Sequence, residues 1–177
     1  MINEKIVVDI VEKKLEQILE NAPDKRFFIA AVYVNQNNTI SLFVDNERDS
    51  QKVTLDDCVV ISKYIESQLD REKEDYDLEV STAGLGSPLK VFKQYIKNIN
   101  QKVEVITNNG KKLSGILIEA TPQALPNGTE ALAAITIEYR EKVKVEGKKQ
   151  KIELVSMKRI ESSEFKTVRV IPDLSGL

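Results

Sequence analysis

The spacing of apolar residues changes at the segment LEVSTAGLGSPL, residues 78–89, and this change limits the folds that the chain can adopt. Before the segment, stretches with apolar residues three and four apart, as in amphipathic helices, alternate with strand-like stretches. After it, short alternating stretches are joined by turns that contain glycine, as in all-β domains. A chain of 177 residues is long enough for two small domains. We therefore predict a domain boundary within this segment.

Residues 1–83 are predicted to form an α/β domain. The predicted elements, in order, are a helix over 3–20, strands over 26–35 and 39–46, a helix within 53–70 and a strand over 76–81. Thr54 and Asp57 have the spacing of a capping box at the start of the second helix. The buried face of that helix is predicted to consist of Leu55, Cys58, Val59, Ser62, Ile65 and Leu69. This order of elements predicts two helices packed on one face of a three-stranded sheet.

The rest of the chain is predicted to be a hinge and linking helix, residues 84–98, followed by a small SH3-like or Sm-like β-barrel, residues 99–177. Ser87 and Pro88 are typical of a helix cap and a first helical position, which predicts a helix over 87–98. The short strands and glycine-bearing turns that follow are typical of a small barrel. Gly115, inside one of these strands, predicts a bend or a bulge. The predicted fold class is therefore α+β.

The composition contains no histidine, which excludes the commonest catalytic and metal sites. Ser-His-Asp and Cys-His arrangements and histidine-containing zinc sites cannot be built without an imidazole. The single cysteine, Cys58, cannot form an intramolecular disulfide and is predicted to be a small buried side chain. No cofactor is expected.

Carboxylates remain as candidates for chemistry, and they leave one enzymatic alternative open. Asp56, Asp57 and the acidic residues within 72–79 could ligate metal ions, because two-metal hydrolysis can use carboxylates alone. Capping already explains the Asp pair, since acidic side chains are favourable at a helix N-terminus. We therefore predict no catalytic residue and no metal site, and keep a carboxylate-metal-dependent RNA nuclease as the alternative.

The glycine segment does not match a phosphate-binding loop. GLGSPL lacks the lysine of a Walker loop and the third glycine of the dinucleotide-binding fingerprint. Gly84, Gly86 and Pro88 are therefore predicted to form a hinge, in which glycine lets the backbone turn between a strand and a helix.

Charge is divided unequally between the two halves. Residues 1–87 contain 10 Lys and Arg against 18 Asp and Glu, whereas residues 88–177 contain 16 against 10. The acidic half is expected to bind a basic partner, and the basic half could contact phosphates.

Basic residues of the second half are the candidate binding residues for RNA. The set consists of Lys90, Lys93 and Lys97 at helical spacing, Lys111 and Lys112 in a turn, and Lys158 and Arg159 after a strand. Lys148 and Lys149 occupy another turn. Such residues hold phosphates with strong salt dependence and little sequence specificity. Aromatic residues are sparse in this half, so base stacking is not expected.

The segment LEVSTAGLGSPL, preceded by the helix start VTLDDC and followed by a short helix and VEVITNNGKKLSGILIEA, resembles the ribosome maturation factor RimP family. The resemblance runs from the first helix to about residue 171. The usual loop pattern of the family is Ser-Ser-Pro-Gly-Leu-Asp-Arg-Pro-Leu. Ser81, Gly84, Leu85, Pro88 and Leu89 agree with it, whereas Thr82, Ala83, Gly86 and Ser87 differ. The Asp and the Arg of the pattern are therefore absent here.

The resemblance implies a bacterial factor, with an α/β domain and an SH3-like, Sm-like barrel, that assists assembly of the small (30S) ribosomal subunit. Together with the charge division, it leads us to expect a monomeric, cytoplasmic, non-enzymatic protein that binds the immature subunit. The acidic half would contact a basic ribosomal protein, and the basic half would lie near rRNA. The acidic N-terminus and the short apolar runs predict neither a signal peptide nor a membrane segment. An Sm-like RNA-binding regulator, which would form a ring of several copies, is the second alternative.

Overall fold

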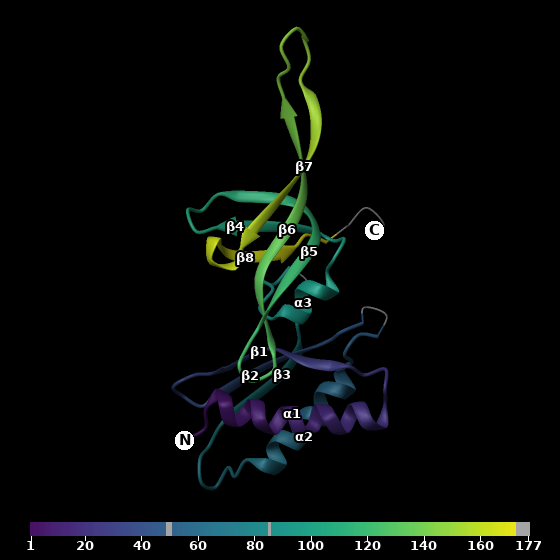
Figure 1. The fold of residues 1–177 in the computed structure, drawn as a ribbon. Helices are drawn as coiled ribbons and strands as arrows, with labels where there is room; N and C mark the ends of the chain where they lie inside the picture. Colours follow the sequence, from purple (N-terminus) through teal and green to yellow (C-terminus); the bar gives the residue numbers. More distant parts are fainter. Residues whose placement is uncertain (49–50, 85, 173–177) are drawn as a thin grey trace. The chain divides into compact units, whose positions relative to one another are not determined.

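The computed structural model describes residues 1–48, 51–84 and 86–172, and the chain divides into two compact units, Met1–Gly84 and Leu85–Leu177. Each unit contains a hydrophobic core formed by its own helices and strands. The two units differ in architecture, as the change in apolar spacing predicts (Figure 1).

The first unit contains two helices and a three-stranded sheet. Its elements are α1 (Glu4–Asn21), β1 (Phe27–Val34), β2 (Thr39–Asn46), α2 (Leu55–Gln68) and β3 (Asp77–Thr82). The strand order is β1-β2-β3, with β1 antiparallel to β2 and β3 parallel to it. Parallel neighbours need a crossover connection, and the segment that contains α2 supplies it.

The core of the first unit lies between the helices and one face of the sheet. Ile40, Leu42 and Val44 alternate along β2 and are fully buried, as strand pleating requires of a face that packs on helices. They belong to one apolar cluster with Val7 of α1 and Ile61 of α2. The prediction of two helices on one face of a three-stranded sheet is therefore confirmed.

The predicted buried face of α2 is wrong in part. Cys58 and Ile65 are buried as predicted, but Leu55 is 80% exposed and Val59 is 43% exposed. The buried residues of the helix are Asp57, Cys58, Ile61 and Ile65. Asp57 turns inward because its carboxylate accepts hydrogen bonds both from Thr54 in the capping box and from the distant Lys25. The first turn therefore presents this acidic side chain, rather than Leu55, to the interior.

The second unit consists of one short helix and five strands. Its elements are α3 (Phe92–Lys97), β4 (Lys102–Thr107), β5 (Lys112–Ala124), β6 (Glu130–Val143), β7 (Ile152–Glu161), the single 3-10 turn η1 (Ser162–Glu164) and β8 (Phe165–Val170). The strands form an antiparallel sheet in the order β7-β6-β5-β4-β8. This sheet agrees with the predicted small barrel-like domain. It is not closed, because its edge strands β7 and β8 do not pair with each other over the described residues.

The helix predicted over 87–98 begins later than expected. Helix α3 starts at Phe92 after the N-cap Val91, and Pro88 lies in an isolated antiparallel bridge with Arg169. The backbone N–H of Leu89 donates to the carbonyl oxygen of Val168 at 2.8 Å. Segment 88–89 therefore runs alongside β8 as extended chain, and this long-range pairing overrides the local preference of Ser-Pro for a helix start.

Gly115 lies where the backbones of β5 and β6 approach each other closely. A Cβ atom at this position would lie 2.5 Å from the carbonyl oxygen of Glu138, a separation that real side chains do not adopt. The irregularities in the β5–β6 pairing lie further along, at Leu117/Glu119 and Thr121/Pro122. The glycine is therefore needed for the close approach of two strands rather than for a bulge.

Neither unit contains, in its described residues, a helix that is both long and apolar enough to span a bilayer.

Substitution Gly115→Ala should destabilise the second unit by about 1–3 kcal/mol, because β5 and β6 must separate to admit the methyl group. Urea unfolding followed by circular dichroism measures the change. Ser114→Ala, on the neighbouring exposed position of the same strand, is the matched control and should change stability by less than about 0.5 kcal/mol. Equal stability of the two variants would contradict the proposed close approach.

Candidate nucleic-acid interface

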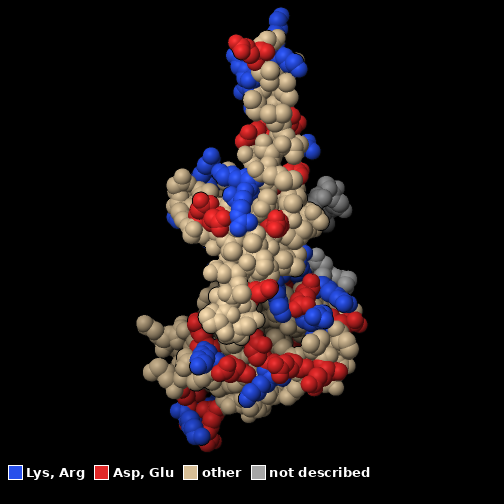
Figure 2. Space-filling model, viewed as in Figure 1, with Lys and Arg blue, Asp and Glu red and all other residues tan. Residues whose placement is uncertain are grey.

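Lys111 and Lys158, which are far apart in the sequence, lie on one shallow hollow of the second unit. The hollow has a volume of about 450 Å³ and is bordered by the β4–β5 turn, β7 and η1. Its lining residues are Thr107, Asn108, Asn109, Lys111, Leu113, Lys158, Ser163 and Glu164. Figure 2 shows basic side chains beside acidic ones over the part of the second unit that carries the β4–β5 turn and β8.

Hydrogen bonds hold the β4–β5 turn against the connection between β7 and β8. The side-chain amide of Asn108 donates to the carbonyl oxygen of Ser163 at 2.5 Å. The backbone N–H of Asn108 donates to the carbonyl oxygen of Glu164 at 3.1 Å. Within the turn, Gly110 has a φ of 83°, a conformation that glycine adopts without strain. The turn therefore fixes the backbone of Lys111 on the same hollow as β7.

The hollow carries two ammonium groups that the fold does not neutralise. Lys111 and Lys158 are exposed, and neither forms an ion pair with a residue that the structure describes. The acidic residue of the lining, Glu164, accepts a hydrogen bond from the backbone N–H of Glu161 through Oε2 at 2.9 Å. Two unpaired lysines beside asparagine side chains can bind anionic oxygen atoms, and a phosphate supplies these.

Arg159 does not join Lys158, because neighbouring residues of a strand point to opposite faces. Its Nε donates to Glu161 at 2.9 Å, and its Nη1 donates across β6 to Thr121 of β5 at 3.1 Å. Lys112 begins β5 and is exposed, but it is not part of the lining of the hollow. Of the predicted pairs Lys111–Lys112 and Lys158–Arg159, the structure therefore brings only Lys111 and Lys158 to the same hollow.

The predicted helical stripe of Lys90, Lys93 and Lys97 is shorter than expected. Lys93 and Lys97 lie one turn apart on α3, whereas Lys90 precedes the helix. The backbone N–H of Lys90 donates to Oε1 of Gln94 at 2.7 Å, and that of Val91 donates to the same atom at 3.1 Å. The buried Gln94 side chain thus caps the start of α3.

The predicted hinge residues belong to the ends of the two units. The backbone N–H of Ala83 donates to the carbonyl oxygen of Val44 at 3.3 Å, which ties it to the first unit. On the other side, the carbonyl oxygen of Gly86 accepts from Nη1 of Arg169 at 3.3 Å, and Gly86 has a φ of 77°. Of the predicted hinge residues, Pro88 is likewise tied to β8, and Gly84 lies between the two attachments.

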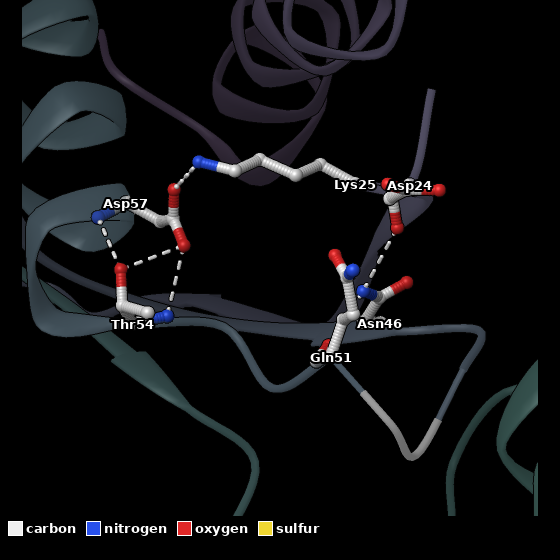
Figure 3. A network of polar contacts seen from close by, with 6 residues as sticks. All are labelled: Asp24, Lys25, Asn46, Gln51, Thr54 and Asp57. Atoms are coloured by element: carbon white, nitrogen blue, oxygen red, sulfur yellow. Dashed lines mark hydrogen bonds and ion pairs between the residues drawn. The ribbon is translucent and has the colours of Figure 1, made fainter. Parts of the chain in front are cut away.

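Asp57, a candidate metal ligand, is held in a polar network at the start of α2 (Figure 3). Its Oδ1 accepts from Nζ of Lys25 at 2.6 Å, and its Oδ2 accepts from the N–H and the hydroxyl of Thr54 at 2.9 and 2.7 Å. Burial raises the pKa of this carboxyl, but the hydrogen bonds from Lys25 and Thr54 outweigh that effect and lower the pKa below its usual value. Both oxygen atoms are therefore used by the fold.

The same network fixes the connection between α1 and β1. Next to Lys25, the carbonyl oxygen of Asp24 accepts from Nδ2 of Asn46 at 3.3 Å, and this amide also donates to Gln51 at 2.6 Å (Figure 3). Asn46 is fully buried at the end of β2. The α1–β1 connection is thus tied to both β2 and α2, which indicates a structural role for these polar residues.

The acidic residues before β3 are also engaged. Glu74 accepts hydrogen bonds from the backbone N–H of Ile2 at 3.0 Å and from Nδ2 of Asn38 at 3.2 Å. Its pKa is lowered, first by the hydrogen bond with the amino group of Met1 and then by these contacts. Across residues 1–48, 51–84 and 86–172, no cluster of three or more His, Cys, Asp or Glu side chains has the arrangement of a metal site.

A second group of basic residues lies on the hairpin formed by β6 and β7, and only two of its members stand out in the sequence. Lys148 and Lys149 form a visible pair in the turn. Lys142, Lys144 and Lys151 flank them and are also exposed. The signal that could have revealed the group is density, because residues 140–151 contain six of the 16 basic residues of the second half and two acidic ones.

Comparisons with known proteins agree on one family. The family model described as RimP N-terminal domain matches residues 8–86. A protein of Porphyromonas gingivalis named ribosome maturation factor RimP is 40% identical over 124 residues, which cover 70% of this chain and 73% of the relative. Proteins of the same name from Christiangramia forsetii and Flavobacterium psychrophilum are 38% and 35% identical, over 57% and 64% of this chain and 63% and 70% of the relatives.

Substitution Asp57→Asn should destabilise the first unit by about 1–3 kcal/mol at pH 7, because it removes the charge that pairs with Lys25 and weakens the helix cap. A carboxyl whose pKa is lowered by folding contributes stability above its unfolded-state value, 3.8, and this contribution is lost as the pH falls through the folded-state value. Urea unfolding of both proteins from pH 7 to pH 2.5 should show a constant difference above about pH 5. The difference should shrink below pH 3.8. A difference that is independent of pH would contradict the ion pair.

Proposed function

We propose that this chain, which belongs to the ribosome maturation factor RimP family, binds the immature small (30S) ribosomal subunit transiently and assists its maturation without catalysing a reaction. Family membership supports a role in ribosome maturation and is the observation that carries the proposal. The choice of subunit and the nature of the contacts are inferred from the resemblance and from the distribution of charge between the two units.

The acidic first unit is proposed to contact a basic ribosomal protein. Glu12, Glu16 and Glu20 follow one another at four-residue spacing along α1 and are exposed. Like charges at this spacing destabilise a helix slightly, so they bring no benefit to the isolated fold. Figure 2 shows acidic side chains along the visible side of α1. A partner rich in lysine and arginine would offset their repulsion.

The basic second unit is proposed to lie against rRNA. The hollow that contains Lys111 and Lys158 presents two unpaired ammonium groups, which suit phosphate oxygen atoms. Lys90, Lys93, Lys97, Lys112 and Arg159 remain proposed contributors to the wider basic surface. Contacts of this kind position a protein on RNA without reading its sequence, which suits a factor that acts on one large assembly.

The remaining features of the proposal follow from this role. The factor works in the cytoplasm as a monomer, without a cofactor. Gly84, Gly86 and Pro88 act as a hinge within the linking segment 84–98, between the domains of residues 1–83 and 99–177. A hinge would allow an acidic and a basic surface to engage different components of the same particle.

Sedimentation tests the proposal directly. In lysates of a bacterium that expresses the tagged protein, it should co-migrate with free, immature small subunits and be absent from mature ribosomes and polysomes. Presence only in polysomes would overturn the proposal.

Light scattering of the purified protein should give a monomer mass, and incubation with magnesium and structured RNA should leave the RNA intact. A multimeric ring or RNA cleavage would instead support the regulator or the nuclease.

The double variant Lys111→Gln, Lys158→Gln should bind immature small subunits more weakly than the wild type. If each lysine neutralises one phosphate, the slope of log affinity against log salt concentration should fall in magnitude by about 1.5–2. The matched control is Lys13→Gln, Lys63→Gln, which removes the same charge from exposed positions of the first unit. An equal loss for the two variants would show that the hollow is not the contact.

A further inference from the structure

The β6–β7 hairpin extends beyond the sheet as a two-stranded ribbon. Pairing between β5 and β6 ends at Ile116 and Glu138, whereas pairing between β6 and β7 continues to Val143 and Ile152. Residues 139–156, here called the ribbon, therefore pair with no third strand among the residues that the structure describes. Figure 1 shows the ribbon projecting away from the other strands of the second unit.

Positive charge is concentrated at the tip of the ribbon. Lys144, Lys148, Lys149 and Lys151 lie in the connection between the strands, and all four are exposed. None of them forms an ion pair with any residue that the structure describes. Lower on the ribbon, Arg140 is neutralised by Glu153 at 3.5 Å. Figure 2 shows basic side chains gathered around the tip together with an acidic group. The connection contains one acidic residue, Glu146, so the four lysines keep positive charge in excess there.

The ribbon contributes little to the stability of the second unit. A two-stranded hairpin is at best marginally stable in water, and repulsion between neighbouring lysines weakens it further. The cross-strand pair Val143 and Ile152 is partly buried and closes the end of the ladder. Leu154 nevertheless remains 46% exposed and Val155 59% exposed. A projecting element with this composition is better explained by a contact with a partner than by stability.

The chemistry of the tip selects phosphates of helical RNA as the partner. Lysine is a flexible point charge that binds phosphate without demanding a fixed geometry. Tyr139, at the base of the ribbon, packs against the core of the second unit, and residues 140–156 contain no aromatic side chain. The projecting part of the ribbon therefore offers no platform on which unpaired bases could stack. Single-stranded RNA would therefore gain little beyond charge. A duplex, whose backbones bring phosphates close together across a groove, offers the denser array of charge.

We infer that the ribbon is an RNA-binding arm whose tip lysines contact the phosphate backbone of double-stranded RNA independently of its sequence. This inference rests on the proposed function, because it names the class of RNA structure that the second unit contacts. The arm is separate from the hollow of Lys111 and Lys158, whose lining contains no residue of the ribbon.

Fluorescence anisotropy with a labelled RNA duplex of about 20 base pairs, measured from 50 to 300 mM potassium chloride, tests the inference. The quadruple variant K144Q, K148Q, K149Q, K151Q should bind the duplex at least tenfold more weakly at 100 mM salt. The slope of log affinity against log salt should fall in magnitude by about 3, since each phosphate contact contributes about 0.7–0.9.

The matched control is the quadruple variant K5Q, K13Q, K52Q, K63Q, which changes the net charge equally through exposed lysines of the first unit. It should lose less than threefold in affinity and keep a slope within about 1 of the wild-type value. Equal losses for the two quadruple variants would overturn the inference, because net charge rather than the arm would then decide binding. The melting temperature of each variant confirms that its fold is retained.

A single-stranded RNA of the same length and a polyglutamate peptide complete the test. The wild type should bind both more weakly than the duplex, and tighter binding of either would overturn the choice of partner. Co-sedimentation with immature small subunits tests the proposed function separately from RNA binding by the ribbon. If the wild type co-sediments but the tip variant keeps full duplex affinity, the arm is disproved and the proposed function stands. If the arm binds duplex RNA but the wild type never joins small subunits, the proposed function fails.

Discussion

The backbone pairing of β6 is the constraint on which the second unit depends. This strand is hydrogen-bonded to β5 along its first part and to β7 along its last part. Where it pairs with both, Ile135 and Ile137 are buried in the core. The pairing with β5 ends at Glu138, at the point where the missing side chain of Gly115 lets the two backbones approach. One strand therefore contributes both the packed centre of the sheet and the projecting basic ribbon.

The spacing of apolar residues predicts the order of elements and the layer arrangement of both units, but it does not predict which residues long-range contacts reposition. In α2, Leu55 fits the apolar stripe, yet the carboxylate of Asp57 turns inward to meet Lys25, a residue distant in the sequence. Likewise, Pro88 is favourable at a helix start, but it pairs with Arg169 of β8 and is therefore extended. In both cases a hydrogen-bonded partner from elsewhere in the chain decides against the local preference.

The candidate site was predictable to the extent that strand geometry alone determines it. Alternation along a strand separates Lys158 from Arg159, and this follows from the sequence once β7 is assigned. The position of Lys111 beside Lys158 does not follow, because it depends on Asn108 reaching the β7–β8 connection. Of the lysines of the ribbon, only Lys148 and Lys149 stand out in the sequence, although the density of basic residues over 140–151 could have revealed the group. Their significance depends on where β5 stops pairing with β6, which requires the register of the sheet.

Some charged residues of the chain stabilise the fold, whereas others are exposed and free to contact a partner. The two groups respond differently to salt. The carboxylate of Asp57 is buried, so its contacts with Lys25 and Thr54 are screened little by added ions. The tip lysines of the ribbon are exposed and repel one another, so added salt reduces that repulsion and favours the folded hairpin. The same salt weakens their attraction for phosphates. Folding of the ribbon and its proposed binding to RNA should therefore respond to salt in opposite directions, so a loss of binding at high salt would not reflect unfolding of the ribbon.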